Sequence, residues 1–254
     1  MAKNTSAPKN AKAAAARAQA QKNVKSQERR TTLGIIIGVA IAIVVFGGIV
    51  LFIVQSSQVP GLDSADAVAP AGADETGGIP IGADGAAGGA VPADAPRLDI
   101  YEDFNCVHCA SFEATNGADI EAMAEAEEAA IWVHPIAFLG DYSTRAANAA
   151  ATVADAEPEA YLDFTSALFA SRPESGGLTD DQIEQVAVDA GVSADVAATF
   201  TDGTFTKWVL AATDQASQDG VTGTPSLMLD RELLTQEDVL YTQPGALRTF
   251  IQEQ

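Results

Sequence analysis

Cys106 and Cys109 are the only cysteines of the 254-residue chain, and two residues separate them. Residues 97–102 directly before them have the pattern of a β-strand, and the stretch from Cys106 to about Ala126 has that of a helix. This order places the Cys106 sulfur at a helix N-terminus, where free N–H groups and the helix dipole favour an anion. A thiolate is such an anion and is the reactive form of cysteine. The spacing therefore predicts thiol chemistry.

Three other interpretations of the cysteine pair are open. A structural disulfide would close a very small loop, and the chain-entropy benefit of a disulfide grows with loop length. A metal site could combine the two sulfurs with His108 and His134. However, His108 lies between the cysteines and cannot easily join both sulfurs around one ion, and there is no second cysteine pair. The third is a non-catalytic adhesive or scaffold ectodomain, in which the cysteine pair would show no activity.

The charge of the chain is distributed unevenly. The formal net charge is −21, yet residues 1–30 contain eight basic residues and one acidic residue. The rest of the chain holds six basic and 34 acidic residues. Such an acidic body repels nucleic acid, so we expect no nucleic-acid partner.

A membrane anchor is predicted directly after this basic tail. The 22 residues from Leu33 to Val54 contain no charge and no proline, and about 20 apolar residues span a bilayer as a helix. Apolar regions of signal peptides are usually shorter, so we expect a retained anchor (33–54) rather than a cleaved signal. A small-residue site at Ala65-Asp66-Ala67 is the minor alternative. The positive charges place the tail (1–32) in the cytoplasm and everything after the anchor outside.

The remaining residues divide into a predicted linker and a predicted domain. Residues 55–96 are rich in Ala, Gly and Pro and contain no aromatic residue, a composition typical of a flexible tether. The more apolar piece 78–82 is a candidate edge strand of the domain. Residues 97–254 are long enough for one sizeable core.

The domain reads as an α/β fold. A second strand is predicted at 130–135, parallel to the first because a helix separates them. Only helical patterns follow over about 143–219, including a capping box that begins at Thr179. A strand at 226–229, a second hairpin arm at 232–234 and a closing helix at 245–252 complete the chain.

This pattern resembles the DsbA-like branch of the thioredoxin superfamily, whose members are thiol–disulfide oxidoreductases with a helical insertion. The resemblance covers about 97–254 and is carried by Asp103-Phe-Asn-Cys-Val-His-Cys109 and by Gly220-Val-Thr-Gly-Thr-Pro-Ser226. It implies a thioredoxin-like fold with an all-helical insertion. Membrane-tethered members of this kind are extracytoplasmic oxidative-folding proteins of Gram-positive bacteria.

The resemblance also implies a role for each site residue. Cys106 is the nucleophile and Cys109 the more buried resolving thiol, and the only redox group is their disulfide, without a further cofactor. His108 stabilises the Cys106 thiolate, or is simply a solvated residue at the helix start. Thr224 and Pro225 match the cis-proline loop that pairs with an extended substrate, or form an ordinary turn. His134 is expected to be structural.

Two departures from the family pattern concern redox properties. Val107 occupies the position where DsbA itself has proline, and Ile100 stands where many relatives carry a buried acid. Glu102 and Asp103 are the nearer acids; either would accept a proton from Cys109 or be a solvated loop residue, and we favour the solvated interpretation for Asp103.

The predicted function is an outward-facing thiol oxidase that passes its disulfide to unfolded exported proteins. A membrane or extracytoplasmic redox partner would then reoxidise the cysteine pair, and the bilayer would be contacted through the anchor. A reductase or isomerase on the same fold is the alternative. His108 favours the oxidase.

Overall fold

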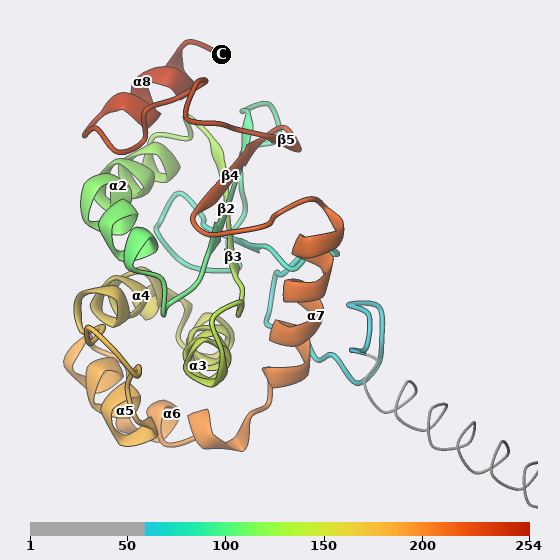
Figure 1. Cartoon of the computed structure of the whole chain (residues 1–254), viewed down its shortest axis with the longest axis vertical. Coiled ribbons are helices and arrows are strands. Elements are labelled where there is room, and N and C mark those ends of the chain that lie inside the picture. The colour runs from blue at the N-terminus through green and yellow to red at the C-terminus, as the bar shows by residue number, and fades with distance from the viewer. Residues whose placement is uncertain (1–58) are drawn as a thin grey trace, which may run out of the picture. The chain divides into compact units, whose positions relative to one another are not determined.

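The computed structural model describes residues 59–254, and a mixed β-sheet runs through their centre (Figure 1). The predicted basic tail (1–32) and the predicted transmembrane anchor (33–54) lie outside the described residues. Within 59–254, no helix is both long enough and apolar enough to cross a membrane.

The sheet has five strands in the order β1-β3-β2-β4-β5. The strands are β1 (Ile79–Pro80), β2 (Arg97–Glu102), β3 (Ala130–Pro135), β4 (Ser226–Leu229) and β5 (Glu232–Leu233). The α-helices are α2 (Val107–Glu125), α3 (Asp141–Ala156), α4 (Tyr161–Ala170), α5 (Asp180–Asp189), α6 (Ala194–Ala197), α7 (Thr206–Gln218) and α8 (Ala246–Gln252), with short 3-10 helices at Pro158–Ala160 and Phe200–Asp202.

The central pair of strands is parallel, as predicted. Leu98 and Ile100 of β2 lie opposite Ile131 and Val133 of β3. The connection runs through α2, which is long enough to return the chain to the same end of the sheet. β4 then pairs antiparallel with the other side of β2 and continues into β5 through a tight hairpin.

Helices cover both faces of the sheet (Figure 1). On one face, side chains of α2 and α8 join the main core with Leu98 and Ile100. On the other face, Tyr101 and Met228 form a second core with Ala216 of α7. The strand β2 is therefore buried on both sides, and its carboxyl end, which leads into the cysteine pair, is held within the protein.

The helical region lies between β3 and β4, as its sequence pattern predicted. The Thr179 hydroxyl caps α5 by accepting from the Gln182 N–H, and the Gln182 side-chain oxygen accepts from the Thr179 N–H, so the capping box is confirmed. The last helix of the region, α7, begins at Thr206, after Phe200–Asp202 forms a separate 3-10 turn that ends at Gly203 in the left-handed region.

The prediction of a flexible linker over 55–96 is wrong for residues 59–96, which pack against the domain. Four of their apolar side chains are buried in the main core: Ala67, Ile79, Ile81 and Ala87. The candidate edge strand within 78–82 is confirmed, because β1 pairs antiparallel with β3. The average composition of a segment does not decide whether it is ordered. A few well-placed apolar residues suffice to order it once its backbone hydrogen-bonds to a sheet edge.

An ionic network fixes this N-terminal segment to β2. The Asp74 carboxylate accepts hydrogen bonds from the Thr76 and Gly78 N–H groups and from the Arg97 guanidinium. Arg97 in turn bonds Asp99, which lies 2.8 Å from Nε2 of His134. These hydrogen bonds hold the pKa values of Asp74 and Asp99 below the usual range, although burial opposes the shift.

Replacing Asp74 should loosen the segment. We expect Asp74→Ala to lower the free energy of unfolding by about 2 kcal/mol, because it removes charge-assisted hydrogen bonds from partly buried donors. Since the folded-state pKa of Asp74 is lowered, this contribution is present above the unfolded-state pKa of about 3.9 and disappears as pH falls through the folded-state value. Urea unfolding of both proteins at pH 7 and at pH 3 measures it.

Asp84→Ala is the matched control, because Asp84 makes one hydrogen bond, to Ala86, in an exposed turn. An equal loss of stability for the two variants would contradict the role given to Asp74.

Candidate active site

The two cysteines lie at the start of α2. Cys106 is the N-cap residue, and its backbone N–H donates to the Asp103 carbonyl at 2.9 Å. Cys109 lies one turn further on and is fully buried, whereas Cys106 keeps a small exposed area. Both are free thiols in this structure. The expected placement of the Cys106 sulfur at a helix N-terminus is confirmed.

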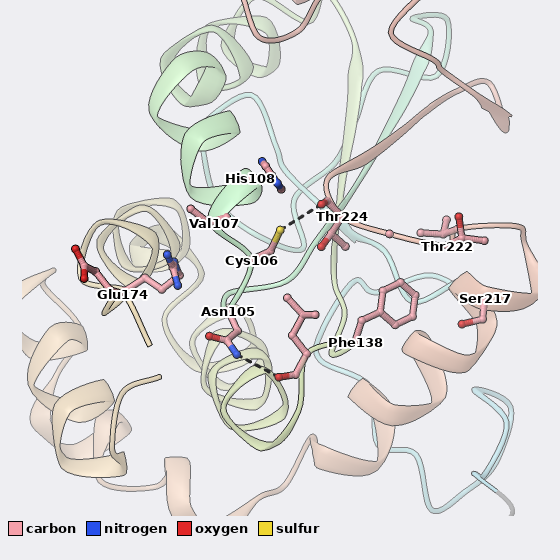
Figure 2. Close-up of a pocket in the computed structure, with 13 residues that line it drawn as sticks. Asn105, Cys106, Val107, His108, Phe138, Glu174, Ser217, Thr222 and Thr224 are labelled. Carbon is pink, nitrogen blue, oxygen red and sulfur yellow. Dashed lines mark hydrogen bonds between the residues drawn. The ribbon is translucent and has the colours of Figure 1, made fainter. Parts of the chain in front are cut away.

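The environment of Cys106 favours its anion. The thiol of Cys109 donates to the Cys106 sulfur and is the largest cause of a pKa lowered to about 5. Burial opposes this shift, while a hydrogen bond from the Thr224 side chain and the N–H groups of Cys109 and His108 add to it. In the protonated form, the Cys106 thiol donates to the Thr224 carbonyl at 3.2 Å (Figure 2).

The environment of Cys109 has the opposite effect. Its hydrogen bond to Cys106, burial and the negative charge of Glu102 raise the pKa of Cys109 far above its ordinary value. One sulfur of the pair is therefore an accessible anion at neutral pH and the other is a buried, protonated thiol. The role of Cys106 as the nucleophile remains a prediction, which its lowered pKa favours, because the thiolate is the nucleophile.

His108 is exposed at the mouth of the site. Its backbone N–H is one of the groups that lower the pKa of Cys106. Its side chain lines two cavities that lie on either side of Thr224. The predicted stabilisation of the thiolate by the imidazole remains a prediction.

The Thr224–Pro225 peptide bond is cis, as the resemblance implied. The loop faces the start of α2, so that Thr224 lies next to Cys106 although the two are 118 positions apart in the chain (Figure 2). A proline has no N–H. The loop therefore presents the backbone of Thr224 to the sulfur.

The solvated interpretation of Asp103 is wrong, because its side chain is completely buried. Its carboxylate accepts from the N–H of Asn105, and from those of Phe138 and Leu139 at 2.8 and 3.0 Å. Burial raises the pKa of Asp103 and these donors partly offset the effect. The side chain thus joins the cysteine turn to the loop after β3.

Glu102 is also buried. Burial, followed by the charge of Glu113, raises the pKa of Glu102 well above its ordinary value. A small cavity lined by Glu102, Glu113, Tyr161 and Ser166 lies beside it. Glu102 and Cys109 interact electrostatically, so this acid is the better candidate for exchanging a proton with the buried thiol.

His134 does not join the cysteines. Its ring stacks on Tyr101 with centroids 4.1 Å apart and bonds Asp99. Within residues 59–254, no group of three or more His, Cys, Asp or Glu side chains is placed to hold a metal ion. The structural role expected for His134 agrees with these contacts.

A cavity of about 960 Å³ opens beside Cys106. It extends from the loop that carries Glu174, past Cys106 and Phe138, to Thr222 and Ser217 near the end of α7 (Figure 2). A second cavity of about 360 Å³ lies between α2 and the segment after β5, and its lining includes Pro225 and Tyr241. Val107, half exposed, and His108 stand at the entrance to the first.

Sequence reasoning missed the walls of the larger cavity. Phe138, Leu139, Arg172 and Glu174 are far from the cysteines along the chain and belong to no motif. Phe138 and Leu139 had one available signal, their place in the loop between β3 and α3, whereas Arg172 and Glu174 lie in the loop between α4 and α5. Only the tertiary structure shows that they surround Cys106.

The fold, the dithiol at the start of α2 and the cis-proline loop that faces it define a DsbA-like thiol–disulfide oxidoreductase. The family model described as thioredoxin matches residues 92–243. The chain therefore belongs to the thioredoxin family. No curated protein matches it in sequence.

Solved structures with the same fold include three from Gram-positive and mycobacterial sources. MdbA from Actinomyces oris, a thiol-disulfide oxidoreductase, has a TM-score of 0.63 at 20% identity and covers 77% of this chain and 97% of its own. BdbD from Bacillus subtilis has a TM-score of 0.58 at 18% identity, covering 74% and 97%. The disulfide bond oxidoreductase DsbG from Mycobacterium tuberculosis has a TM-score of 0.54 at 26% identity, covering 65% and 82%.

Alkylation of the reduced protein should reveal the difference between the two sulfurs. We expect iodoacetamide to modify Cys106 with a rate that is half-maximal near pH 5, while Cys109 stays unmodified. Mass spectrometry of peptides after reaction between pH 4 and 9 measures both rates.

The same pKa shift affects the stability of the reduced protein. Because the folded-state pKa of Cys106 is lowered, the thiolate stabilises the reduced fold above the unfolded-state pKa of about 8.5, and this stabilisation disappears as pH falls through about 5.

If the alkylation rate of Cys106 is half-maximal at a pH near the ordinary cysteine pKa, or if both cysteines are labelled equally, the difference between the two sulfurs is contradicted. Urea-unfolded protein is the control, since both thiols should then react with ordinary pKa values.

Proposed function

We propose that this protein is an extracytoplasmic thiol oxidase that donates its Cys106–Cys109 disulfide to exported proteins as they fold. The observation that carries the proposal is the opposite behaviour of the two sulfurs. A low pKa of Cys106 stabilises the reduced pair, and a stable reduced pair makes the disulfide a strong oxidant.

The transfer consists of two thiol–disulfide exchanges. A substrate thiolate attacks the Cys106 sulfur, forms a mixed disulfide with it and breaks the Cys106–Cys109 bond, so that Cys109 leaves with the electron pair. A second substrate thiolate then attacks the substrate sulfur of the mixed disulfide and releases the Cys106 thiolate. The substrate loses two electrons and gains a disulfide, and the cysteine pair is reduced to the dithiol.

Release of Cys106 as an anion favours the second exchange. A leaving thiol with a low pKa departs faster, and the helix N-terminus, Thr224 and the Cys109 thiol all stabilise the departing Cys106 sulfur. Cys109 needs a proton when it leaves, because its pKa is raised. Glu102, a buried carboxyl whose pKa is also raised, is the group we assign to supply it.

Thr224 is positioned to bind the substrate backbone. Its carbonyl accepts from the Cys106 thiol while that thiol is protonated. Once Cys106 is in a disulfide it has no proton to donate, so the same carbonyl is available for an N–H of an extended substrate segment. This would bring the substrate cysteine to Cys106.

The proposed location follows from the residues outside the described part of the chain. The apolar run 33–54 anchors the protein in the cell membrane, and the basic tail keeps the N-terminus in the cytoplasm. Substrates are then exported proteins, and a membrane or extracytoplasmic redox partner restores the disulfide. Relatives of the same fold are named as thiol-disulfide oxidoreductases, which supports the activity.

A reductase or isomerase is the second candidate, since the same exchanges run in both directions. The lowered pKa of Cys106 favours the oxidase, because it shifts the equilibrium toward the dithiol. A metal-binding ectodomain is the least favoured, because His134 is held by Asp99 and not by the cysteines.

Serine substitutions separate the roles of the two cysteines. We expect full-length Cys106→Ser to lose oxidation of a reduced, unfolded substrate protein completely, because the attacked sulfur is absent. The Cys109→Ser variant, mixed with a substrate that carries an activated disulfide, should instead accumulate a mixed disulfide at Cys106. The thiol that would resolve this mixed disulfide is absent. Gel mobility without reductant and recovery of the folded substrate measure both results.

Disulfide transfer by Cys106→Ser at the rate of the unmodified protein would refute the oxidase. A mixed disulfide at Cys109 rather than at Cys106 would reverse the roles.

Glu102→Gln tests the proton exchange. We expect the exchange with substrate thiols to slow roughly 100-fold at neutral pH, because proton transfer by a positioned group typically contributes this much. The pH profile should also lose the inflection due to Glu102. Glu125→Gln, at an exposed position of α2, is the control. A slowed rate with an unchanged pH profile would mean that Glu102 is only structural.

A further inference from the structure

We infer that the acidic surface of the domain, acting most strongly at the entrance to the cysteine pair, selects cationic polypeptides as substrates. The inference rests on the proposed function and names the class of exported protein that reacts fastest. The acidic residues form no binding site for one particular sequence; they raise the concentration of cationic chains near the reactive sulfur.

The charge of the domain is larger than solubility requires. Residues 59–254 contain six basic and 34 acidic residues, a formal net charge of −28. A net charge of magnitude roughly 2–8 keeps a small domain soluble. A larger charge opposes folding, because like charges repel one another within a compact protein. The effect of the excess therefore falls on the molecules that approach the protein.

Little of this negative charge is cancelled within the domain. Of the 34 acidic side chains, three are buried: Asp99, Glu102 and Asp103. Four of the six basic side chains already pair with carboxylates: Arg97, Arg145, Lys207 and Arg248. Within residues 59–254, Arg172 and Arg231 are the basic residues that form no ion pair. Most acidic side chains therefore face solvent without a cation beside them.

Three exposed acids lie at the entrance to the cysteine pair. Each lines the cavity beside Cys106 or lies within two residues of a side chain that does: Asp141, Glu174 and Asp219. These are called the entrance acids. Glu174 and Ser217, which is close to Asp219 in the chain, lie on opposite sides of Cys106 (Figure 2). The cavity lining contains one basic side chain, Arg172, so negative charge prevails where a substrate enters.

This negative charge opposes the approach of the reacting group itself. The thiolate is the nucleophile, so the group that attacks Cys106 is an anion. Cationic residues elsewhere in the substrate reverse the sign of the total interaction with the domain. Charge of one sign around a cleft raises the local concentration and the association rate of oppositely charged partners roughly 10–1,000-fold. Cationic chains should therefore be oxidised faster than acidic chains of the same length.

Single-cysteine peptides of different charge test this selection. Three peptides share a Gly-Ser sequence and carry four Lys, four Gln or four Glu residues well separated from the cysteine. Each is mixed with the oxidised full-length protein in a non-ionic detergent, and alkylation with mass spectrometry follows the loss of the Cys106–Cys109 disulfide. Each rate constant is divided by that of the same peptide with hydroxyethyl disulfide, an uncharged reagent. This division removes differences in thiol pKa among the peptides.

The expected result depends on salt. At about 20 mM salt, we expect the Lys peptide to react roughly tenfold faster than the Gln peptide, and the Glu peptide to react more slowly than both. At about 1 M salt, where the Debye length is about 3 Å, the three rates should converge.

Two triple variants of equal net charge locate the effect. The first neutralises the entrance acids: Asp141→Asn, Glu174→Gln and Asp219→Asn. The second neutralises exposed acids near the far end of α2, where Gln252 bonds Glu128: Glu125→Gln, Glu127→Gln and Glu253→Gln. The 19 residues of α2 span about 28 Å, whereas the Debye length at 0.1 M salt is about 10 Å. At this salt concentration, the first variant should lower the ratio of Lys to Glu rates about threefold, and the second should keep it.

Mercaptoethanol, an uncharged thiol, distinguishes failure of the selection from failure of the function. If mercaptoethanol reduces the pair while the three peptides react at equal normalised rates at low salt, the selection is refuted and the oxidoreductase stands. If the two triple variants change the ratio equally, the entrance acids have no special effect and the inference is again refuted. If neither mercaptoethanol nor any peptide reduces the pair, the proposed function fails and the inference fails with it.

Discussion

The hydrogen bond between the two sulfurs is the interaction on which the chemistry depends. It lowers the pKa of Cys106 and raises that of Cys109, so one contact favours both the anion at Cys106 and the protonated thiol at Cys109. The two groups differ because the helix start offers N–H groups to Cys106, whereas Cys109 is turned toward the core and the charge of Glu102. Much of the surrounding structure serves to keep the sulfurs in this relation.

Two buried supports hold the turn that carries them. Asp103, directly after β2, binds three backbone N–H groups and joins the cysteine turn to the loop after β3. From the other side, the cis-proline loop brings Thr224 to Cys106. Because β2 is buried on both faces and pairs with β3 and β4, these supports converge at one end of a rigid sheet.

Local patterns predicted the elements that contain their own signals. The cysteine spacing, the alternation of Leu98 and Ile100 and the capping box at Thr179 each lie within a few residues, and the structure contains the predicted helix start, strand and cap. The segment 59–96 differs from the predicted linker because its stability comes from pairing with β3 and from the ion pair between Asp74 and Arg97. Amino-acid composition carries no information about these tertiary partners.

The site shows the same limit. The motifs identified Cys106, Cys109 and Thr224, but burial decides the role of Asp103, and sequence alone does not report burial for an acid next to a turn. Likewise, Phe138 and Leu139 line the cavity beside Cys106 only because β3, which precedes them, pairs in parallel with β2, which precedes the cysteines. Residues that act through tertiary contacts therefore emerge only from the structure.

The reduction potential of the Cys106–Cys109 pair in the full-length protein tests the central claim most directly. Equilibration with glutathione buffers, followed by alkylation and counting of modified thiols by mass, measures it. We expect a potential at the oxidising end of the range for such pairs, about −120 mV, because the Cys106 thiolate stabilises the reduced form. A potential of about −270 mV, typical of a reducing thioredoxin, would contradict it.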